Sequence, residues 1–578
     1  MSRRTVLWLL LIAAVLPYFV GLNDSSIWDA NEAFYVETPR EMLESGDYVS
    51  PSFNYEPRFN KPVLSYWIVA AFYRVFGISP GVQRLPIALA AAVLIAAAFF
   101  LARLAWQAGS ADAAGRMEAA LWAGLGLAIT PRLLMFSRRI FIDMYITMFM
   151  GLTLLFFALA ERYPARRRLF LILMYVSVGL GVLTKGPIAV MLPGIVFGVY
   201  LLLRREIHRV RDMMIPAGAL IVSLIVVPWY ATLYARYGWM HIGSFLLGEN
   251  VARYTEGYGV DSVRGPIFYV PVLFSDSFPW SAFLLAAAVA GWRSRRSTLA
   301  DDRVTRFRLL LWLWIGIIVL FFSLSAAKQD LYIFPIVPAV AALAGLTIAR
   351  GLAQEPRAAR AIRLTTVVVG LVVVLVAAGV VYLFGEGGSN YALDGALMTS
   401  VVGMAGGMIV TVLALSYRLW PSLVAMAATF IVLNWIFVLR VLPSFEAYKP
   451  SPSFARTLQP LLGPDAVVAT YDEALPSLVF YLRRHVEQLF EEDRIVALLE
   501  GHRPAYAVLS RENYASIANG LDARTCIIES RPTFDVKLRT VLAREPLPEL
   551  VLVTNRCGAN PSTGQRINGS MPADPLTR

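Results

Sequence analysis

Apolar stretches of roughly 20 residues recur along this chain between residues 5 and 440. A stretch of that length, coiled as an α-helix, crosses the ~30 Å hydrocarbon core of a bilayer. Hydrophobic residues make up 57% of the 578 residues, and the mean hydropathy is +0.60. Soluble domains are only about 45–50% apolar. The pattern predicts an all-α polytopic membrane protein.

The apolar stretches predict about 13 transmembrane helices. The first, 5–22, lacks a small-residue cleavage site, so we expect a retained anchor rather than a signal peptide. The segment 62–77 is short and contains Arg74, which favours an interfacial or re-entrant helix. The thirteen candidates are 5–22, 82–106, 118–134, 141–160, 168–184, 187–203, 213–235, 267–292, 308–326, 331–349, 362–384, 395–416 and 420–441.

The arginines indicate how these spans are oriented. They cluster in every second loop, and such loops face the cytoplasm. The N-terminus is then cytoplasmic, and an odd number of spans places the C-terminus outside. This clustering accounts for the net charge of +12 without nucleic acid as a partner. The clusters are Arg162/Arg166/Arg167/Arg168, Arg204/Arg205/Arg209/Arg211, Arg293/Arg295/Arg296/Arg303/Arg306/Arg308 and Arg350/Arg357/Arg360/Arg363.

The opposite loops also carry cations, against that rule. The chain has only five lysines against 47 arginines, and three of the five, Lys61, Lys185 and Lys328, fall in these outer loops. An ammonium or a guanidinium at a water–lipid boundary suits a phosphate. We therefore expect a phosphorylated lipid to be handled there. The outer cations are Lys61, Arg132, Arg138, Arg139, Lys185, Arg253, Arg264 and Lys328.

The composition changes after Phe445. Residues 446–557 are charged and alternate helical patterns with β-rich runs at 466–470, 505–509, 525–529 and 550–554, which predicts a small α/β domain. We divide the chain into a membrane domain (1–444), an α/β domain (445–557) and a disordered tail (558–578). Both cysteines, Cys526 and Cys557, lie in the second domain. A disulfide is favoured if that domain is outside the cytoplasm, and two free thiols remain the alternative.

Two acidic sites stand out near the outer face. Asp29 lies where the chain leaves the first span, and Glu32 and Glu37 could converge with it if a helix begins near Ala30. The alternative is a capped interfacial helix with a solvated acidic face. Asp143 lies one turn inside its span, where a carboxylate costs a few kcal/mol and is paired or functional. A structural ion pair is the alternative role.

Sequence gives weak support for cofactors. The four histidines are scattered, and His241 near Glu249 is the one outer-loop metal candidate. No phosphate-binding Walker loop, dinucleotide glycine motif or nucleophile elbow occurs in a suitable context, which disfavours ATP-driven work. We expect no required cofactor, and a divalent metal stays open, with its ligands unknown.

Several motifs in this order resemble a known superfamily. They are Trp28-Asp29-Ala30-Asn31-Glu32, Phe59-Asn60-Lys61-Pro62, Arg138 to Asp143, Leu183-Thr184-Lys185-Gly186-Pro187, and Phe321 to Ser325 running into Lys328, Tyr332 and Pro335. Together they resemble the protein O-mannosyltransferase-like branch of the GT-C glycosyltransferases. Within that branch they are most similar to the bacterial enzymes that transfer 4-amino-4-deoxy-L-arabinose to lipid A.

The resemblance implies a GT-C fold and an inverting enzyme of the bacterial inner membrane. Its donor would be a sugar on undecaprenyl phosphate, its acceptor a lipid A phosphate on the periplasmic face, and its product would confer polymyxin resistance. It implies a lipid bilayer as surroundings, and we expect a monomer. Asp29, Glu32 and Asp143 are the catalytic candidates. The substrate-binding candidates are Tyr35, Lys61, Arg138, Lys185, Arg253, Lys328 and Tyr332.

One departure and two alternatives stay open. Relatives often carry Asp-Glu directly, whereas Ala30 and Asn31 separate Asp29 from Glu32 here, which disfavours a paired-carboxylate metal site. A protein hydroxyl or another glycan could be the acceptor, and a base such as Asp29 would then be needed. A lipid flippase is the alternative from another class. Transporters carry charged groups near the midplane and internal repeats, and this sequence displays neither.

Overall fold

The computed structural model describes residues 1–29, 31–106, 113–139, 142–257, 264–292, 303–385, 391, 393–518, 520–521, 525–534 and 538–557. The chain forms two compact units. The first comprises residues 1–447 with 536–546, and the second comprises residues 448–535 with those from 547 onward. The domain limits expected from composition stay a prediction, and the tail 558–578 lies outside the described residues.

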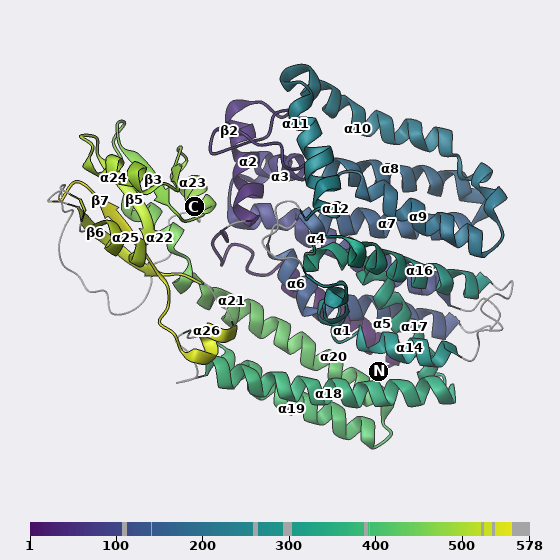
Figure 1. Ribbon diagram of the computed structural model, residues 1–578. Coiled ribbons are helices and arrows are strands. Elements are labelled where there is room, and N and C mark those ends of the chain that lie inside the picture. The colour runs from purple at the N-terminus through teal and green to yellow at the C-terminus, as the bar shows by residue number, and fades with distance from the viewer. Residues whose placement is uncertain are drawn as a thin grey trace. The chain divides into compact units, whose positions relative to one another are not determined.

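The first unit is a bundle of long helices that run side by side (Figure 1). In the described part of the chain, nine helices are long and apolar enough to cross a membrane. A bent pair, α5 (Ala113–Ala128) with α6 (Pro131–Ser137), would make a tenth. The nine are built on α4 (Pro80–Ala105), α7 (Ile142–Arg162), α8 (Arg167–Lys185), α10 (Ile215–Tyr237), α16 (Arg303–Leu324), α17 (Val337–Leu352), α18 (Pro356–Phe384), α19 (Ala396–Leu415) and α20 (Leu419–Ile436).

The other three expected spans form shorter helices, so nine or ten of the thirteen candidates are long enough to cross a membrane within the described residues. Helix α1 (Arg3–Val15) has 13 residues and α9 (Ile188–Leu203) has 16. The expected span 267–292 is interrupted, giving α13 (Tyr269–Asp276) and α14 (Ala282–Trp292). At 1.5 Å per residue, a helix of 13–16 residues rises about 20–24 Å and falls short of the hydrocarbon core.

The segment between α1 and α4 contains several short elements. It contains α2 (Asn31–Ser45), a two-stranded antiparallel hairpin of β1 (Ser52–Phe53) and β2 (Glu56–Pro57), and α3 (Leu64–Phe76). Helix α3 is the short apolar helix expected over 62–77. Helix α4 begins at Pro80, and the preceding residue Ser79 caps it with a side chain that accepts from the Val82 N–H. These local signals fix where α4 enters the bundle.

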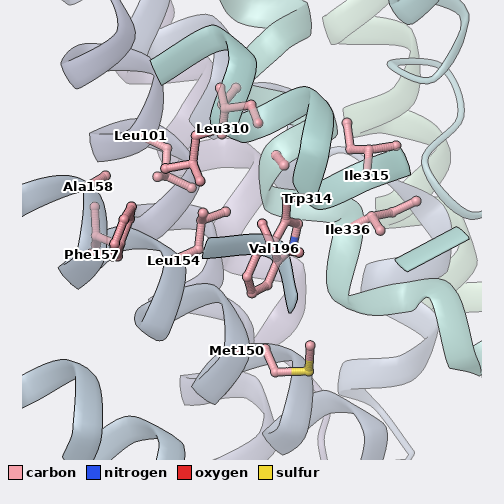
Figure 2. Packing of buried hydrophobic residues seen from close by; sticks show 14 of the residues in the cluster. Leu101, Met150, Leu154, Phe157, Ala158, Val196, Leu310, Trp314, Ile315 and Ile336 are labelled. Carbon is pink, nitrogen blue, oxygen red and sulfur yellow. The ribbon is translucent and has the colours of Figure 1, made fainter. Parts of the chain in front are cut away.

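An apolar core joins α4, α7, α9, α16 and α17 (Figure 2). Phe157 and Phe197 stack with ring centroids 4.0 Å apart, and Phe197 reaches the ring of buried Trp314 at 6.2 Å. Helix α17 approaches α5 closely, because a Cβ at Gly345 would lie 2.6 Å from backbone atoms of Ala119 and Ala123. Such packing holds the helix ends in fixed relative positions.

The second unit is an α/β domain, as its composition predicts. Its five-stranded sheet has the order β4-β3-β5-β7-β6, with β3 parallel to β4 and β5, and with β7 antiparallel to β5 and β6. The four expected β-runs are β3, β5, β6 and β7, and Cys526 forms a disulfide with Cys557. The elements are α22 (Pro450–Leu458), β3 (Val467–Tyr471), α23 (Pro476–Leu482), β4 (Glu487–Leu489), α24 (Glu492–Glu500), β5 (Ala505–Ser510), α25 (Arg511–Ala518), β6 (Cys526–Pro532) and β7 (Glu549–Thr554).

Candidate active site

A cavity of about 570 Å³ lies at one end of the membrane helices of the first unit. Its walls are the N-terminal end of α7, the α8–α9 junction, the C-terminal end of α16 and the segments after α2 and α10. Four cationic and two acidic side chains are among its described lining residues, an excess of two positive charges. They are Arg58, Lys61, Lys185, Arg253, Asp143 and Glu249.

Glu249 organises two of these cations. It lies in a π-helical segment (Ser244–Ala252) that follows α11 (Trp239–Gly243) and precedes α12 (Arg253–Thr255). Its Oε2 accepts from Lys61 Nζ and from Arg253 Nη1, both at 2.9 Å. Lys61 comes from the loop before α3, 188 residues away in sequence. One carboxylate therefore holds two cations from distant segments against the cavity.

Asp143 and Lys185 form the second charged pair. Asp143 lies in the first turn of α7, and Lys185 is the last residue of α8, where each charge suits the dipole of its helix. The Lys185 ammonium donates to Asp143 Oδ1 and lies 5.1 Å from the centroid of the Tyr332 ring. Gly186, at φ +98°, ends α8 directly after the lysine. The turn into α9 thus fixes Lys185 at the cavity wall.

Arg58, Phe34 and Tyr35 line the cavity near α2, and Tyr66 packs behind them. The Arg58 guanidinium lies 4.0 Å from the centroid of the Phe34 ring, and its Nη1 donates to the Tyr66 hydroxyl at 3.4 Å. Tyr35 stacks on Tyr66 with ring centroids 5.6 Å apart. Cation–π contacts hold a guanidinium in place and leave other donors for a ligand. Arg58 thus adds a further cation to the cavity lining.

Burial and neighbouring charges shift the titration of the pair at Glu249. Burial lowers the pKa of Lys61 below its ordinary value of 10.5, and the charges of Lys185 and Arg253 act in the same direction, while Glu249 opposes them. For Glu249, burial raises the pKa, but Lys61 and Arg253 lower it by more, so the net shift is downward. A neighbouring anion would favour the charged form of Lys61.

Six of the ten residues expected at the site meet in this cavity. They are Tyr35, Lys61, Asp143, Lys185, Arg253 and Tyr332. The described lining also includes Arg58, Asn60, Glu249 and Gln329, which we did not select from the sequence. Arg58 is a further cation in an outer loop, so the charge rule that singled out Lys61 applied to it as well. Glu249 precedes Arg253 by one helical turn, a spacing that predicts an ion pair.

Glu32 and Arg138 lie in buried polar networks outside this lining. Glu32 Oε1 accepts from Arg84 Nε at 2.9 Å, and its Oε2 accepts from the Trp28 N–H at 2.9 Å. Arg138 donates to the backbone carbonyls of Pro17 and Val20 at 2.8 and 2.7 Å. These contacts tie the end of the first helix and the start of α2 to α4 and α6. Both side chains therefore stabilise segments next to the cavity.

Lys328 and Asp29 also lie outside the described lining. Lys328 is 5% exposed, and its ammonium donates to the backbone carbonyl of Ser325. The adjacent backbone pairs with the Arg253 segment through Ala326 N–H to Tyr254 O, at 2.8 Å. Asp29 is half-buried in the turn before α2, next to Trp28. The structure thus brings the neighbours of Lys328, Ser325 and Gln329, to the cavity instead.

Within the described ranges, no group of three or more His, Cys, Asp or Glu side chains could hold a metal ion. His241, the outer-loop candidate, packs against the rings of Phe59 and Tyr237, with centroid distances of 4.8 and 5.9 Å. Its environment is aromatic, whereas metal-binding imidazoles donate to a carboxylate, a carbonyl or water.

Similarities to known proteins agree with this site. Residues 60–231, which carry Lys61, Asp143 and Lys185, match the family described as dolichyl-phosphate-mannose-protein mannosyltransferase. The crystal structure of ArnT from Cupriavidus metallidurans bound to undecaprenyl phosphate covers 97% of this chain and 100% of its own, with a TM-score of 0.77 and 22% identity. The chain has the fold of the GT-C glycosyltransferases. The resemblance drawn from the sequence motifs is confirmed.

Curated sequences similar to this chain carry a specific activity in their names. The undecaprenyl phosphate-alpha-4-amino-4-deoxy-L-arabinose arabinosyl transferase of Pseudomonas aeruginosa (strain LESB58) is 33% identical over 352 residues. Transferase 1 of that name from Pseudomonas fluorescens (strain Pf0-1) is 29% identical over 362 residues. These matches cover 60 and 62% of this chain, and the chain spans about 60% of the length of each relative.

Proposed function

We propose that this chain is an inverting glycosyltransferase. It moves 4-amino-4-deoxy-L-arabinose from undecaprenyl phosphate to a lipid A phosphate, on the periplasmic face of the bacterial inner membrane. The GT-C fold, the transferase names of the curated relatives and the solved complex with undecaprenyl phosphate support this activity. A modification of lipid A with a cationic sugar would reduce the binding of cationic peptides such as polymyxin.

The single observation that carries this proposal is the cationic cavity at the ends of membrane helices. Four cations and two carboxylates share a cavity whose remaining lining is rich in apolar side chains, including Ile146, Met150 and Leu192. A polyprenyl-phosphate sugar combines an anion with a lipid tail and a polar headgroup. Few other substrates require all three surfaces at one membrane boundary.

The transfer step has a simple balance of bonds. An acceptor oxygen forms a bond to the anomeric carbon of the sugar, and the bond from that carbon to the phosphate oxygen breaks. Negative charge then develops on the departing undecaprenyl phosphate. We expect Lys61, Arg253 and Arg58, which line the cavity, to stabilise that charge as donors. Preorganised donors of this kind are worth about 3–4 kcal/mol each in other enzymes.

The carboxylates of the cavity suit the sugar rather than the phosphate. A 4-amino sugar carries an ammonium, and an oxocarbenium-like transition state carries positive charge on the ring. Asp143 and Glu249 are the described acids in the lining. If the acceptor is an ionised lipid A phosphate, it requires no general base. We assign Asp143, held by Lys185, to electrostatic stabilisation of the sugar, and the catalytic role of Asp29 stays a prediction.

A second candidate function has one specific observation in its favour. The family that matches residues 60–231 is described by transfer of mannose to protein. A serine or threonine hydroxyl would need a base to remove its proton, and Asp143 or Asp29 would have to supply that base. The donor chemistry is the same in both cases, so the acceptor alone distinguishes them.

Mass spectrometry of lipid A tests the proposal most directly. Cells that carry the chain should yield lipid A with an added aminopentose, and cells without it should lack that mass. The Asp143→Asn variant should lose the product while its protein level stays normal. A sugar-modified peptide in place of modified lipid A would support the second candidate. If membranes that contain the chain form neither product when they are supplied with donor, both candidate functions are contradicted.

A further inference from the structure

Lys61, Glu249 and Arg253 form a triad of charges in the wall of the cavity. Oε2 of Glu249 accepts from Lys61 Nζ and from Arg253 Nη1, each at 2.9 Å. All three side chains line the cavity and are between 19 and 23% exposed. Two cations and one carboxylate give the triad a net charge of +1. A bound phosphate would therefore meet attraction from two members and repulsion from the third.

A phosphate bound by this triad must lie close to the Glu249 carboxylate. Hydrogen bonds from a cationic nitrogen to an anionic oxygen are about 2.7–2.9 Å long. A phosphate oxygen that accepts from Lys61 Nζ is then at most about 6 Å from Oε2 of Glu249, because both oxygens contact the same nitrogen. The same bound applies through Arg253 Nη1. Two anions at this separation in a partly buried cavity repel each other appreciably.

The phosphate of the donor gains one negative charge during the proposed transfer. The donor is a phosphodiester with a single negative charge. When the bond from the anomeric carbon to the phosphate oxygen breaks, its electron pair stays on that oxygen, and a phosphate monoester is formed. The second pKa of a monoester is about 6, so undecaprenyl phosphate carries close to two negative charges at about pH 8. An ionised lipid A phosphate loses one charge in return when its oxygen bonds to the sugar.

On the basis of the proposed glycosyl transfer, we propose that Glu249 promotes release of the product by limiting how strongly the site prefers a doubly charged phosphate. Coulomb energies scale with the charge of the phosphate. Lys61 and Arg253 therefore attract the product about twice as strongly as the donor, and Glu249 repels it about twice as strongly. The carboxylate cancels part of the preference for product and leaves both cations in place for the donor.

A role of Glu249 in positioning alone would give a different result. Burial lowers the pKa of Lys61, Lys185 and Arg253 lower it further, and Glu249 raises it, so loss of the carboxylate also changes Lys61. That change acts on the binding of either phosphate, as does any misplacement of the two cations. The ratio of the two affinities therefore reports the charge of Glu249 more directly than either affinity alone.

The ratio is measured with two lipids that differ by one charge, undecaprenyl phosphate and its methyl ester, which is a phosphodiester. Each lipid is titrated against the purified full-length protein in phosphatidylcholine nanodiscs at about pH 8, where the monoester is a dianion. Glu249→Gln keeps a side-chain oxygen that accepts from Lys61 and Arg253, but it removes the negative charge. It should raise the affinity for undecaprenyl phosphate, relative to that for the methyl ester, by about tenfold.

Two further variants support the assignment. Asn60 lines the cavity beside Lys61 and is exposed, so Asn60→Asp adds a negative charge with little change of shape. It should change the ratio in the opposite direction, by about threefold or more. Glu256→Gln removes an exposed carboxylate that follows the same segment and lies outside the described lining. Because water and salt screen that charge, the ratio should stay within about twofold of wild type.

An unchanged ratio in folded Glu249→Gln would overturn the proposal, and so would an equal change in Glu256→Gln. If Glu249→Gln does not fold, an unchanged ratio in Asn60→Asp would overturn it instead. In each of these cases the wild type still binds both lipids, and the glycosyl-transfer proposal stands. Binding of neither lipid to the wild type would contradict the proposed donor, and the role of Glu249 with it.

Discussion

Lys61 shows how position within the fold gives a common side chain a special role. It is one of five lysines, and its ammonium reaches Glu249 across 188 residues of sequence. We expect Lys61→Ala to weaken binding of the undecaprenyl-phosphate donor by about tenfold to a hundredfold, because it removes one charge-assisted hydrogen bond. Equilibrium donor binding measures this. Arg236→Gln, which breaks the exposed ion pair with Asp47 outside the cavity, is the control.

The lowered pKa of Lys61 gives a pH dependence with a definite sign. If the donor phosphate binds the protonated form of Lys61, as proposed, affinity is retained at low pH and lost as pH rises through the pKa of Lys61. Burial places that pKa below 10.5. The decline should therefore begin at a lower pH in the wild type than in Lys61→Arg, whose guanidinium stays charged. Identical alkaline profiles for the two proteins would remove Lys61 from phosphate binding.

The sequence predicts that Lys328 binds substrate, whereas its contacts favour a structural role. Its ammonium is buried and donates to the Ser325 carbonyl, so it holds the turn between α16 and α17. Lys328→Met should lower the thermal stability of the protein and leave donor affinity within about twofold. Donor titration and a melting curve on the same preparation separate the effects. A large loss of donor affinity at normal stability would restore the phosphate role.

At the scale of elements, one buried ion pair holds α2 against α4. Glu32 and Arg84 are both buried, and removal of one partner from such a pair costs about 3–5 kcal/mol. We expect Glu32→Ala to unfold at a clearly lower temperature than wild type. The double variant Glu32→Leu with Arg84→Met removes both charges and should recover much of the loss. A stable Glu32→Ala protein without activity would instead support the catalytic role predicted from sequence.

Helix α17 approaches α5 through a glycine. A methyl group at Gly345 would lie 2.6 Å from backbone atoms of α5, which cannot move aside as a side chain can. Gly345→Ala should therefore destabilise the bundle by about 1–3 kcal/mol, as overpacking does. Gly316→Ala on α16 is the matched control, since nothing lies within 4 Å of its Cβ position. That change should be neutral or stabilising by up to ~1 kcal/mol, measured by thermal unfolding.

At the scale of the whole molecule, the orientation in the membrane can be tested by labelling. Glu256 follows Thr255, which lines the cavity, and Arg205 lies beyond the opposite end of α9; both side chains are exposed. Each is replaced by cysteine. The native Cys526 and Cys557 are paired and should not react. In spheroplasts, a membrane-impermeant maleimide should label Glu256→Cys at once and Arg205→Cys only after permeabilisation. The reverse result would invert the proposed topology.

The sequence by itself determined the membrane class and the α/β unit, and it predicted the two faces of the bundle. Apolar length and loop charge are local properties, and they are sufficient for these conclusions. They also singled out Lys61, Asp143, Lys185 and Arg253 as charged residues at positions where a membrane protein rarely carries charge. Local patterns did not reveal where an apolar run is interrupted, as between α13 and α14.

Only the tertiary structure decided which of the selected charges meet. Glu32 and Arg138 carry the same local signature as Asp143 and Lys185, yet they pair with Arg84 and with backbone carbonyls instead. Partner choice depends on how α2, α4 and α6 pack, and no short segment encodes that. For the same reason, Arg58 and Glu249 entered the site only when contacts between segments far apart in the chain were known.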